Sequence, residues 1–85
     1  IFGTGNQEAY PDTFVDSIGT LKQWIEKSNG VVVGYTSTEG YTYSSSRGEV
    51  EGKFCGLAVD DVNQSELTDS RINNWIEILK KEFTL

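Results

Sequence analysis

The side chains that could do chemistry in this chain are few. The sequence of 85 residues contains no histidine and one cysteine, Cys55. Histidine-based metal sites and Ser-His or Cys-His nucleophile pairs are therefore excluded. Cys55 lies within an apolar run and cannot form an internal disulfide, which predicts a buried, inert thiol and is consistent with a reducing, cytoplasmic compartment.

Acidic side chains are the most abundant chemical groups. Thirteen Asp and Glu residues oppose seven Lys and Arg residues, for a net charge of −6. This charge repels nucleic acid and anionic membranes and favours basic protein partners. Each acid in predicted loops and helix starts is either ordinarily solvated or part of a surface that steers such partners, and the candidates are Glu8, Asp12, Asp16, Asp60, Asp61, Glu66 and Asp69.

A polar loop near the N-terminus could bind a ligand. The apolar start at residues 1–3 predicts the end of a strand over 1–5, as if the strand began before Ile1. Residues 6–10, ending in Tyr10, then lead to Pro11. From the residues alone this segment is either a plain strand-to-helix turn with a tyrosine at the solvent edge, or a binding loop.

The elements that must position this loop alternate between helix and strand. Pro11 is suited to a first helical turn, and a helix with the apolar stripe Phe14, Ile18, Leu21 and Ile25 should follow, with Trp24 in the core. Asn29 and Gly30 end it. The VVVGY run at 31–35 predicts a buried central strand.

The second half repeats this alternation around an irregular stretch. Residues 36–52 show no periodicity and are predicted to form a long inserted loop, in which the positions of two tyrosines stay open. An apolar strand should follow over 53–59. Thr68 should then open a helix whose stripe includes Trp75 in the core.

This order predicts an α/β domain with a mainly parallel sheet. The composition, 36% hydrophobic and 12% aromatic, fits a folded chain, and no run is long and apolar enough to span a membrane. The apolar faces of two amphipathic helices need more strands to cover them than this chain supplies. We therefore expect a second half of the domain to provide further strands.

Two motifs carry a family resemblance. FGTGNQ at 2–7 and YPDTF at 10–14 resemble the strand, flavin loop and helix start of flavodoxins. Further matches resemble the last strand, inserted loop and final helix of the long-chain group: Gly34, TEGY at 38–41, GKF at 52–54, GL at 56–57, Asp60, NQS at 63–65, LTD at 67–69, Arg71, Ile72 and Trp75.

The resemblance implies a flavodoxin-like, doubly wound parallel sheet, with residues 1–85 as the C-terminal half of one domain: strand 4, helix 4, the split strand 5 and helix 5. It also implies an FMN-binding, low-potential single-electron carrier that is not an enzyme. Tyr10 would stack on the flavin, and backbone groups of Thr4, Gly5, Asn6 and Gln7 would meet the edge of its ring. Many family members have aspartate where this chain has Asn6.

The implied partners are basic redox proteins such as a flavodoxin reductase, and the N-terminal half that would hold the flavin's phosphate. Two alternatives stay open. The chain could belong to the FMN domain of a larger reductase, or it could be a non-redox piece that is inactive by itself.

Overall fold

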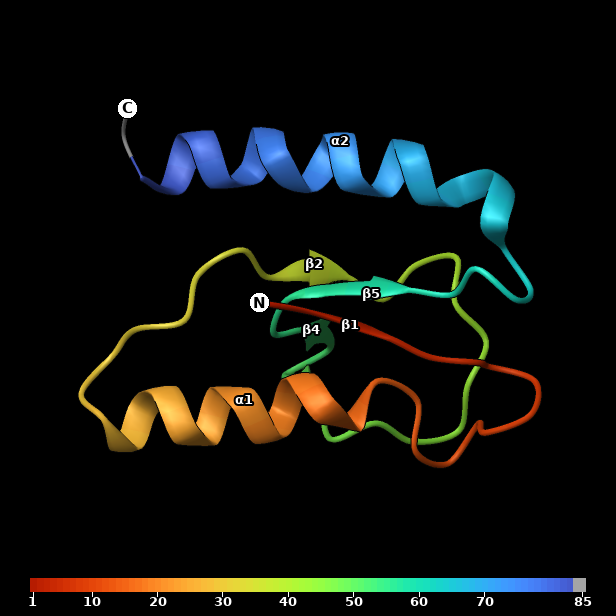
Figure 1. The fold of residues 1–85 in the computed structure, drawn as a ribbon, viewed down its shortest axis with the longest axis horizontal. Helices are drawn as coiled ribbons and strands as arrows, with labels where there is room; N and C mark the ends of the chain where they lie inside the picture. The colour runs from red at the N-terminus through yellow and green to blue at the C-terminus, as the bar shows by residue number, and fades with distance from the viewer. Residues whose placement is uncertain (84–85) are drawn as a thin grey trace.

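The computed structural model describes residues 1–83, so Thr84 and Leu85 of the predicted domain 1–85 lie outside the described residues. The elements in chain order are β1 (Phe2–Thr4), α1 (Asp16–Lys27), β2 (Thr36–Ser37), β3 (Glu49–Val50), β4 (Lys53–Phe54), β5 (Leu57–Val59) and α2 (Ser65–Glu82). The strands form a middle layer, with α1 on one side and α2 on the other (Figure 1).

The centre of the fold is a parallel strand pair. β1 pairs with β5 in the register Phe2↔Leu57 and Thr4↔Val59. All three residues of β5 are buried, as expected for a strand with helices on both faces. The predicted α/β class with a parallel sheet is confirmed. The predicted strand over 53–59 is interrupted at Cys55 and Gly56, so that its first part, β4, belongs to a different sheet.

That second sheet is small and antiparallel. Its order is β2-β4-β3, and Phe54 of β4 lies opposite both Thr36 and Glu49. β2 and β3 belong to the stretch 36–52, so this stretch folds back on the strand that follows it. That the stretch is an insertion stays a prediction.

The predicted helical start at Pro11 is wrong, because α1 begins at Asp16 after Val15, which has a left-handed backbone with φ 47°. The carbonyl oxygen of Pro11 accepts hydrogen bonds from the amides of Ser44 and Ser45, at 2.8 and 3.0 Å. The carbonyl of Phe14 accepts one from the Ser46 hydroxyl. Contacts with the segment 44–46 thus use carbonyls that a helix would need for itself.

Trp24 was predicted in the core, and this is wrong. Its side chain is 62% exposed, whereas Ile18 is fully buried. At about 100° per residue, Trp24 lies about 120° around the helix from Ile18. The buried stripe is therefore too narrow to include it. Trp75 of α2 is half-buried, with its ring edge-on to Phe2.

The predicted buried strand at 31–35 is also wrong. No strand covers these residues, and Val31 is 83% exposed. The backbone of Gly34 bonds to side chains of α2 instead: its amide donates to Glu82 Oε2 at 2.6 Å, and its carbonyl accepts from Trp75 Nε1 at 3.0 Å. Within residues 1–83, β1 and β5 pair with each other and leave no strand beside 31–35.

α2 begins at Ser65, three residues before the predicted start at Thr68. The hydroxyl of Thr68 donates to Asp61 Oδ1 at 2.5 Å rather than capping the helix. The predicted apolar stripe of α2 is only partly covered, since Ile76 is 41% and Phe83 56% exposed.

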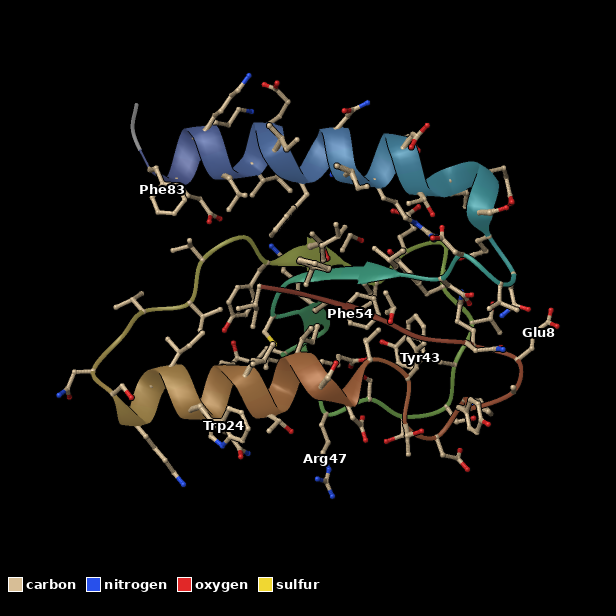
Figure 2. The ribbon with its side chains drawn as sticks, in the orientation of Figure 1. Glu8, Trp24, Tyr43, Arg47, Phe54 and Phe83 are labelled. Carbon is tan, nitrogen blue, oxygen red and sulfur yellow. The ribbon has the colours of Figure 1, made fainter. Side chains whose placement is uncertain are left out.

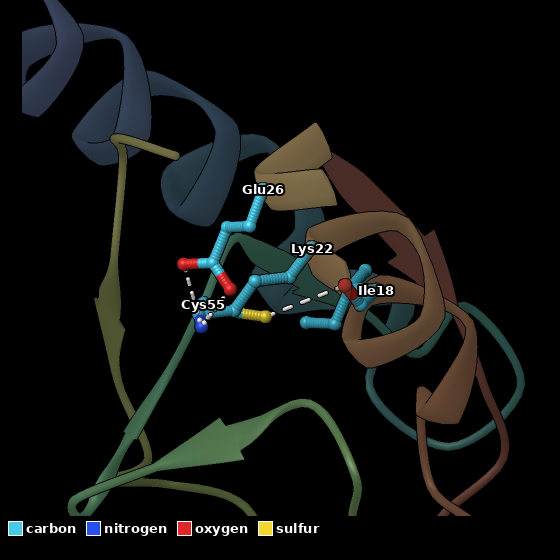
Figure 3. Close-up of polar contacts among 4 residues, drawn as sticks. All are labelled: Ile18, Lys22, Glu26 and Cys55. Carbon is cyan, nitrogen blue, oxygen red and sulfur yellow. Dashed lines mark hydrogen bonds and ion pairs between the residues drawn. The ribbon is translucent and has the colours of Figure 1, made fainter. Parts of the chain in front are cut away.

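The core joins α1 to β4 and β5. Its buried members are Phe14, Val15, Ile18, Phe54, Cys55 and Ala58. The thiol of Cys55 donates to the Ile18 carbonyl at 3.5 Å, beside the Lys22–Glu26 ion pair (Figure 3). Cys55 is fully buried, as predicted. This burial raises the pKa of its thiol and opposes thiolate formation.

Among the residues that the structure describes, neither helix combines the length and apolar character needed to cross a membrane.

Candidate functional site

The predicted binding loop begins where β1 ends. The Gly5 amide donates to the Val59 carbonyl at 2.8 Å, so the parallel pairing with β5 continues one residue beyond β1. The loop therefore starts at the carboxyl ends of two adjacent parallel strands. This is the edge at which open α/β sheets bind their ligands.

Four of the five predicted site residues line one hollow. Its volume is about 250 Å³, and its lining residues are Thr4, Gly5, Asn6, Tyr10, Thr13, Phe14, Val15, Asp16 and Ser17. The left-handed turn at Val15 brings the start of α1 against the loop. The local departure from the predicted helix thus helps to form this hollow.

Tyr10 presents an available aromatic surface at this hollow. Its side chain is 66% exposed, and its amide donates to the Asn6 carbonyl at 2.9 Å. This turn holds the backbone of Tyr10 close to the loop while the ring stays uncovered. An exposed ring of this kind can stack against a flat ligand.

Asn6 fixes the shape of the loop. Its Oδ1 accepts hydrogen bonds from the Ala9 amide at 2.9 Å and from Asn63 Nδ2 at 2.8 Å. Asparagine commonly stabilises turns by bonding to the backbone in this way. The side chain brings no formal charge to the hollow.

Gln7, the fifth predicted residue, is not brought together with the other four. It is 4% exposed, and its side chain is fully engaged: Nε2 donates to Asp60 Oδ2 at 2.7 Å and to Gln64 Oε1 at 2.8 Å, and Oε1 accepts from the Thr42 amide at 2.6 Å. Gln7 therefore joins the loop to two other segments. A contact between its backbone and a ligand stays a prediction.

Asp60 was predicted near the surface, and this is wrong, because it is fully buried. Its Oδ2 accepts from the Gln7 amide, Gln7 Nε2 and Asn63 Nδ2, and its Oδ1 accepts from the amides of Val62 and Asn63, all at 2.7–3.2 Å. Burial raises the pKa of the carboxyl, but the hydrogen bonds from Asn63 and Gln7 outweigh it and lower the pKa to about 2.

Asp60 organises the site without lining its hollow, and the sequence analysis missed this role. The available signal was an acid directly after a buried apolar strand, followed by the amides Asn63 and Gln64. The other candidate acids are exposed, namely Glu8, Asp12, Asp61, Glu66 and Asp69. Asp16 is half-buried and accepts the Arg47 amide at 2.7 Å.

The hollow fits a flat, uncharged ring better than a phosphate. Asp16 is the charged side chain among its lining residues, and an acid repels a phosphate. The exposed ring of Tyr10 offers an aromatic face beside the hollow, and Thr4, Gly5 and Asn6 line it. Within residues 1–83, no group of three potential metal-binding side chains occurs.

The stretch 36–52 covers the core next to the loop. Tyr41 and Tyr43, whose positions the sequence left open, both pack on Phe54, with ring centres 4.9 and 5.4 Å away. Figure 2 shows Tyr43 beside Phe54. The Tyr41 hydroxyl donates to the Ala58 carbonyl at 2.6 Å. The guanidinium carbon of Arg71 lies 3.9 Å from the Tyr41 ring centre, an attractive cation–π contact.

A parallel strand pair, a helix on each side and a ligand-sized hollow at the carboxyl ends together define part of a doubly wound α/β domain. No protein-family model matches the chain. A flavodoxin from Nostoc sp. (strain PCC 7120) is 51% identical over 84 residues, which cover 99% of this chain and 49% of the relative. A flavodoxin from Haemophilus influenzae is 43% identical over 86 residues, covering 100% of this chain and 49% of the relative.

The solved structures agree with these relatives. The structure of Fusobacterium nucleatum flavodoxin bound to flavin mononucleotide matches with a TM-score of 0.90 and 46% identity, over 95% of this chain and 48% of that one. The chain spans about half the length of the curated relatives it matches. It belongs to the flavodoxin family and corresponds to the C-terminal half of its members, as the sequence motifs predicted.

Proposed function

We propose that the chain forms one side of an FMN site in a single-electron carrier, a flavodoxin. The observation that carries the proposal is the exposed ring of Tyr10 beside the hollow lined by Thr4, Gly5 and Asn6. The similarity to FMN-bound Fusobacterium flavodoxin supports the choice of cofactor.

Bound FMN would supply the single-electron chemistry. The residues of this chain would hold its ring: Tyr10 covers one face and limits water, while backbone groups of Thr4 to Asn6 meet the edge. Gln7 would not contact the ring with its side chain but would hold the loop in place through its hydrogen bonds to Asp60. The buried negative charge of Asp60 disfavours further negative charge nearby, which supports a low potential.

Other parts of the cofactor would require the half of the family that this chain does not match. The hollow contains an acid and no basic side chain, so it does not suit the phosphate. We propose that the complementary half holds the phosphate and covers the second face of the ring.

The proposed partners are basic redox proteins such as a flavodoxin reductase, since the net charge is −6. The protein would carry electrons and would not convert a substrate. It would not bind nucleic acid or insert into a membrane. We place it in the cytoplasm, which the single, buried Cys55 supports.

A flavin titration tests this function. FMN fluorescence is followed as the chain is added alone, and then as it is added with a polypeptide covering the unmatched half of the Nostoc flavodoxin. We expect strong quenching with the pair and much weaker quenching with either part. The matched half of the Nostoc protein, paired in the same way, is the positive control. If that control binds FMN and this chain does not, the proposed function is wrong.

A further inference from the structure

The turn that follows α1 contains an asparagine–glycine pair, Asn29 and Gly30. Both residues are exposed. An asparagine side chain loses ammonia most readily before a glycine, because glycine has no side chain to shield its main-chain nitrogen. Of the asparagines in the chain, Asn29 is the one that precedes a glycine. The pair lies beyond the C-terminal end of α1, whereas the flavin hollow lies at the start of this helix (Figure 1).

Deamidation at such a pair needs water but no cofactor. The main-chain nitrogen of Gly30 attacks the side-chain carbonyl carbon Cγ of Asn29, and the bond from Cγ to Nδ2 breaks. The departing nitrogen takes up the proton of the Gly30 amide, so ammonia is released and a cyclic succinimide remains. Water then opens the ring at either carbonyl. The products are aspartate and isoaspartate, in which the main chain runs through the side chain.

The end of α1 restrains the attacking nitrogen. The Gly30 amide donates to the Ile25 carbonyl at 2.8 Å, and the Asn29 amide donates to the Glu26 carbonyl at 3.1 Å. Asn29 has a left-handed backbone, with φ 63°. These two bonds and this conformation are those of a Schellman motif. The Gly30 nitrogen must give up the proton in its bond and turn toward Asn29 Cγ, so the reaction requires the bond to Ile25 to open.

The other asparagines are restrained by more than a helix end. Asn6 and Asn63 bond to each other through Oδ1 and Nδ2 at 2.8 Å, and the amides that follow them both donate to Asp60 at 3.0 Å. Asn73 and Asn74 lie inside α2. The asparagine–glycine pair is instead held by the last turn of one helix, where local opening costs least free energy.

We propose that Asn29 is the deamidation site of this chain, and that opening of the last turn of α1 sets its rate. The product carries one more negative charge, which changes the net charge from −6 to −7. This charge lies at the C-terminal end of α1, where the helix dipole disfavours it. Isoaspartate also inserts an extra carbon into the main chain, so the two bonds of the Schellman motif lose their geometry. The modification therefore shortens α1.

Peptide mapping of the full chain tests the site. The chain is incubated at mildly alkaline pH, once folded and once in guanidinium chloride, and circular dichroism verifies that the first sample is helical. Trypsin cleavage after Lys27 and Arg47 releases residues 28–47, in which Asn29 is the single asparagine. Mass spectrometry measures conversion of the amide to the acid, and enzymatic methylation detects isoaspartate. We expect this peptide to convert first in both samples, and about ten-fold more slowly in the folded chain.

Two matched glycine variants test whether the end of α1 sets the rate. Lys27→Gly lies in the last turn of α1 and Lys81→Gly in the last turn of α2, and both positions are exposed. Glycine destabilises the helix that contains it, so Lys27→Gly should speed the conversion of Asn29 about three-fold in the folded chain. Lys81→Gly should leave this rate unchanged. In guanidinium chloride, both variants and the wild type should react at one rate.

Three results would each overturn the proposal. Earlier conversion of another asparagine would show that Asn29 is not the site. Equal rates in the folded and unfolded wild type would show that the Schellman motif gives no protection, whether or not the variants fold. Equal rates for Lys27→Gly and Lys81→Gly would show that the end of α1 does not set the rate.

Discussion

The side-chain nitrogen of Gln7 lies 2.7 Å from Oδ2 of Asp60, a residue 53 positions later in the chain. The Gln7 amide donates to the same oxygen at 3.0 Å. Gln7 Oε1 accepts from Thr42, so one residue ties the binding loop to the end of β5 and to the stretch 36–52. The shape of the proposed flavin loop therefore depends on contacts that are distant in sequence.

Asp60→Asn should destabilise the fold in a pH-dependent way. The pKa of the carboxyl is lowered from 3.8 to about 2, so its stabilising effect is complete above pH 4 and is lost as pH falls toward 2. This lowering of the pKa contributes about 2 kcal/mol to the free energy of unfolding at neutral pH. Urea unfolding of the wild type and Asp60→Asn between pH 2 and 7 measures this effect.

The two unfolding free energies should differ at pH 7 and converge toward pH 2. Asp69→Asn, at an exposed position, is the control and should follow the wild type throughout. A constant difference between the wild type and Asp60→Asn across the pH range would show that the Asp60 charge is not the stabilising feature.

Gly19→Ala should destabilise the chain although Gly19 lies within α1. A Cβ atom at this position would lie 2.3 Å from the Arg47 carbonyl oxygen, so the helix or the stretch 36–52 would have to move. Helix propensity alone predicts a gain of about 1 kcal/mol, whereas overpacking costs about 1–3 kcal/mol. Thermal unfolding compares this variant with Gln23→Ala, an exposed helix position. An increase in stability for Gly19→Ala would contradict the close approach of Arg47.

The sequence predicted the parts of the fold that depend on local patterns. The helical spacing of Ile18, Leu21 and Ile25 located α1, and the apolar run before Asp60 located β5. The motif containing Tyr10 identified the loop at the carboxyl end of β1. Each of these signals lies within a few residues, where periodicity and composition are informative.

The errors occurred where distant contacts override local preference. Pro11 is an acceptable helix start, but its carbonyl bonds to Ser44 and Ser45. The run at 31–35 is typical of a central strand, but a strand requires a neighbour, and the backbone of Gly34 bonds to α2. The burial of Asp60 likewise depends on Gln7. No local pattern contains these partners.

The backbone amides of residues 31–33 should become protected from hydrogen exchange when the complementary half is added. The apolar hollow of about 220 Å³ lined by Val31, Val32, Val33, Ile1, Ile25, Trp75, Leu79 and Phe83 is suited to an apolar segment. We expect the amides of these valines to exchange rapidly in the chain alone and to become protected with the unmatched half of the Nostoc flavodoxin. Hydrogen exchange measures both states. Unchanged exchange at 31–33 in a pair that binds FMN would show that the complementary half does not cover this segment.

Tyr10→Leu should weaken FMN binding by the complemented chain without unfolding it. The ring is 66% exposed, so its removal costs little packing. Losing aromatic stacking of about 0.5–1.5 kcal/mol should raise the dissociation constant about two- to twelve-fold. Tyr10→Phe keeps the ring and should stay within about two-fold of the wild type. Equal affinity of the leucine and phenylalanine variants, measured by fluorescence titration, would exclude stacking.

The most direct measurement is the nuclear Overhauser effect between Tyr10 ring protons and flavin ring protons in the FMN-bound, complemented chain. Stacking over the hollow lined by Thr4, Gly5 and Asn6 predicts strong cross-peaks from Tyr10 and shift changes at those three residues. Flavin cross-peaks to a different aromatic ring, with no shift change at residues 4–6, would contradict the assignment of this loop as the flavin site.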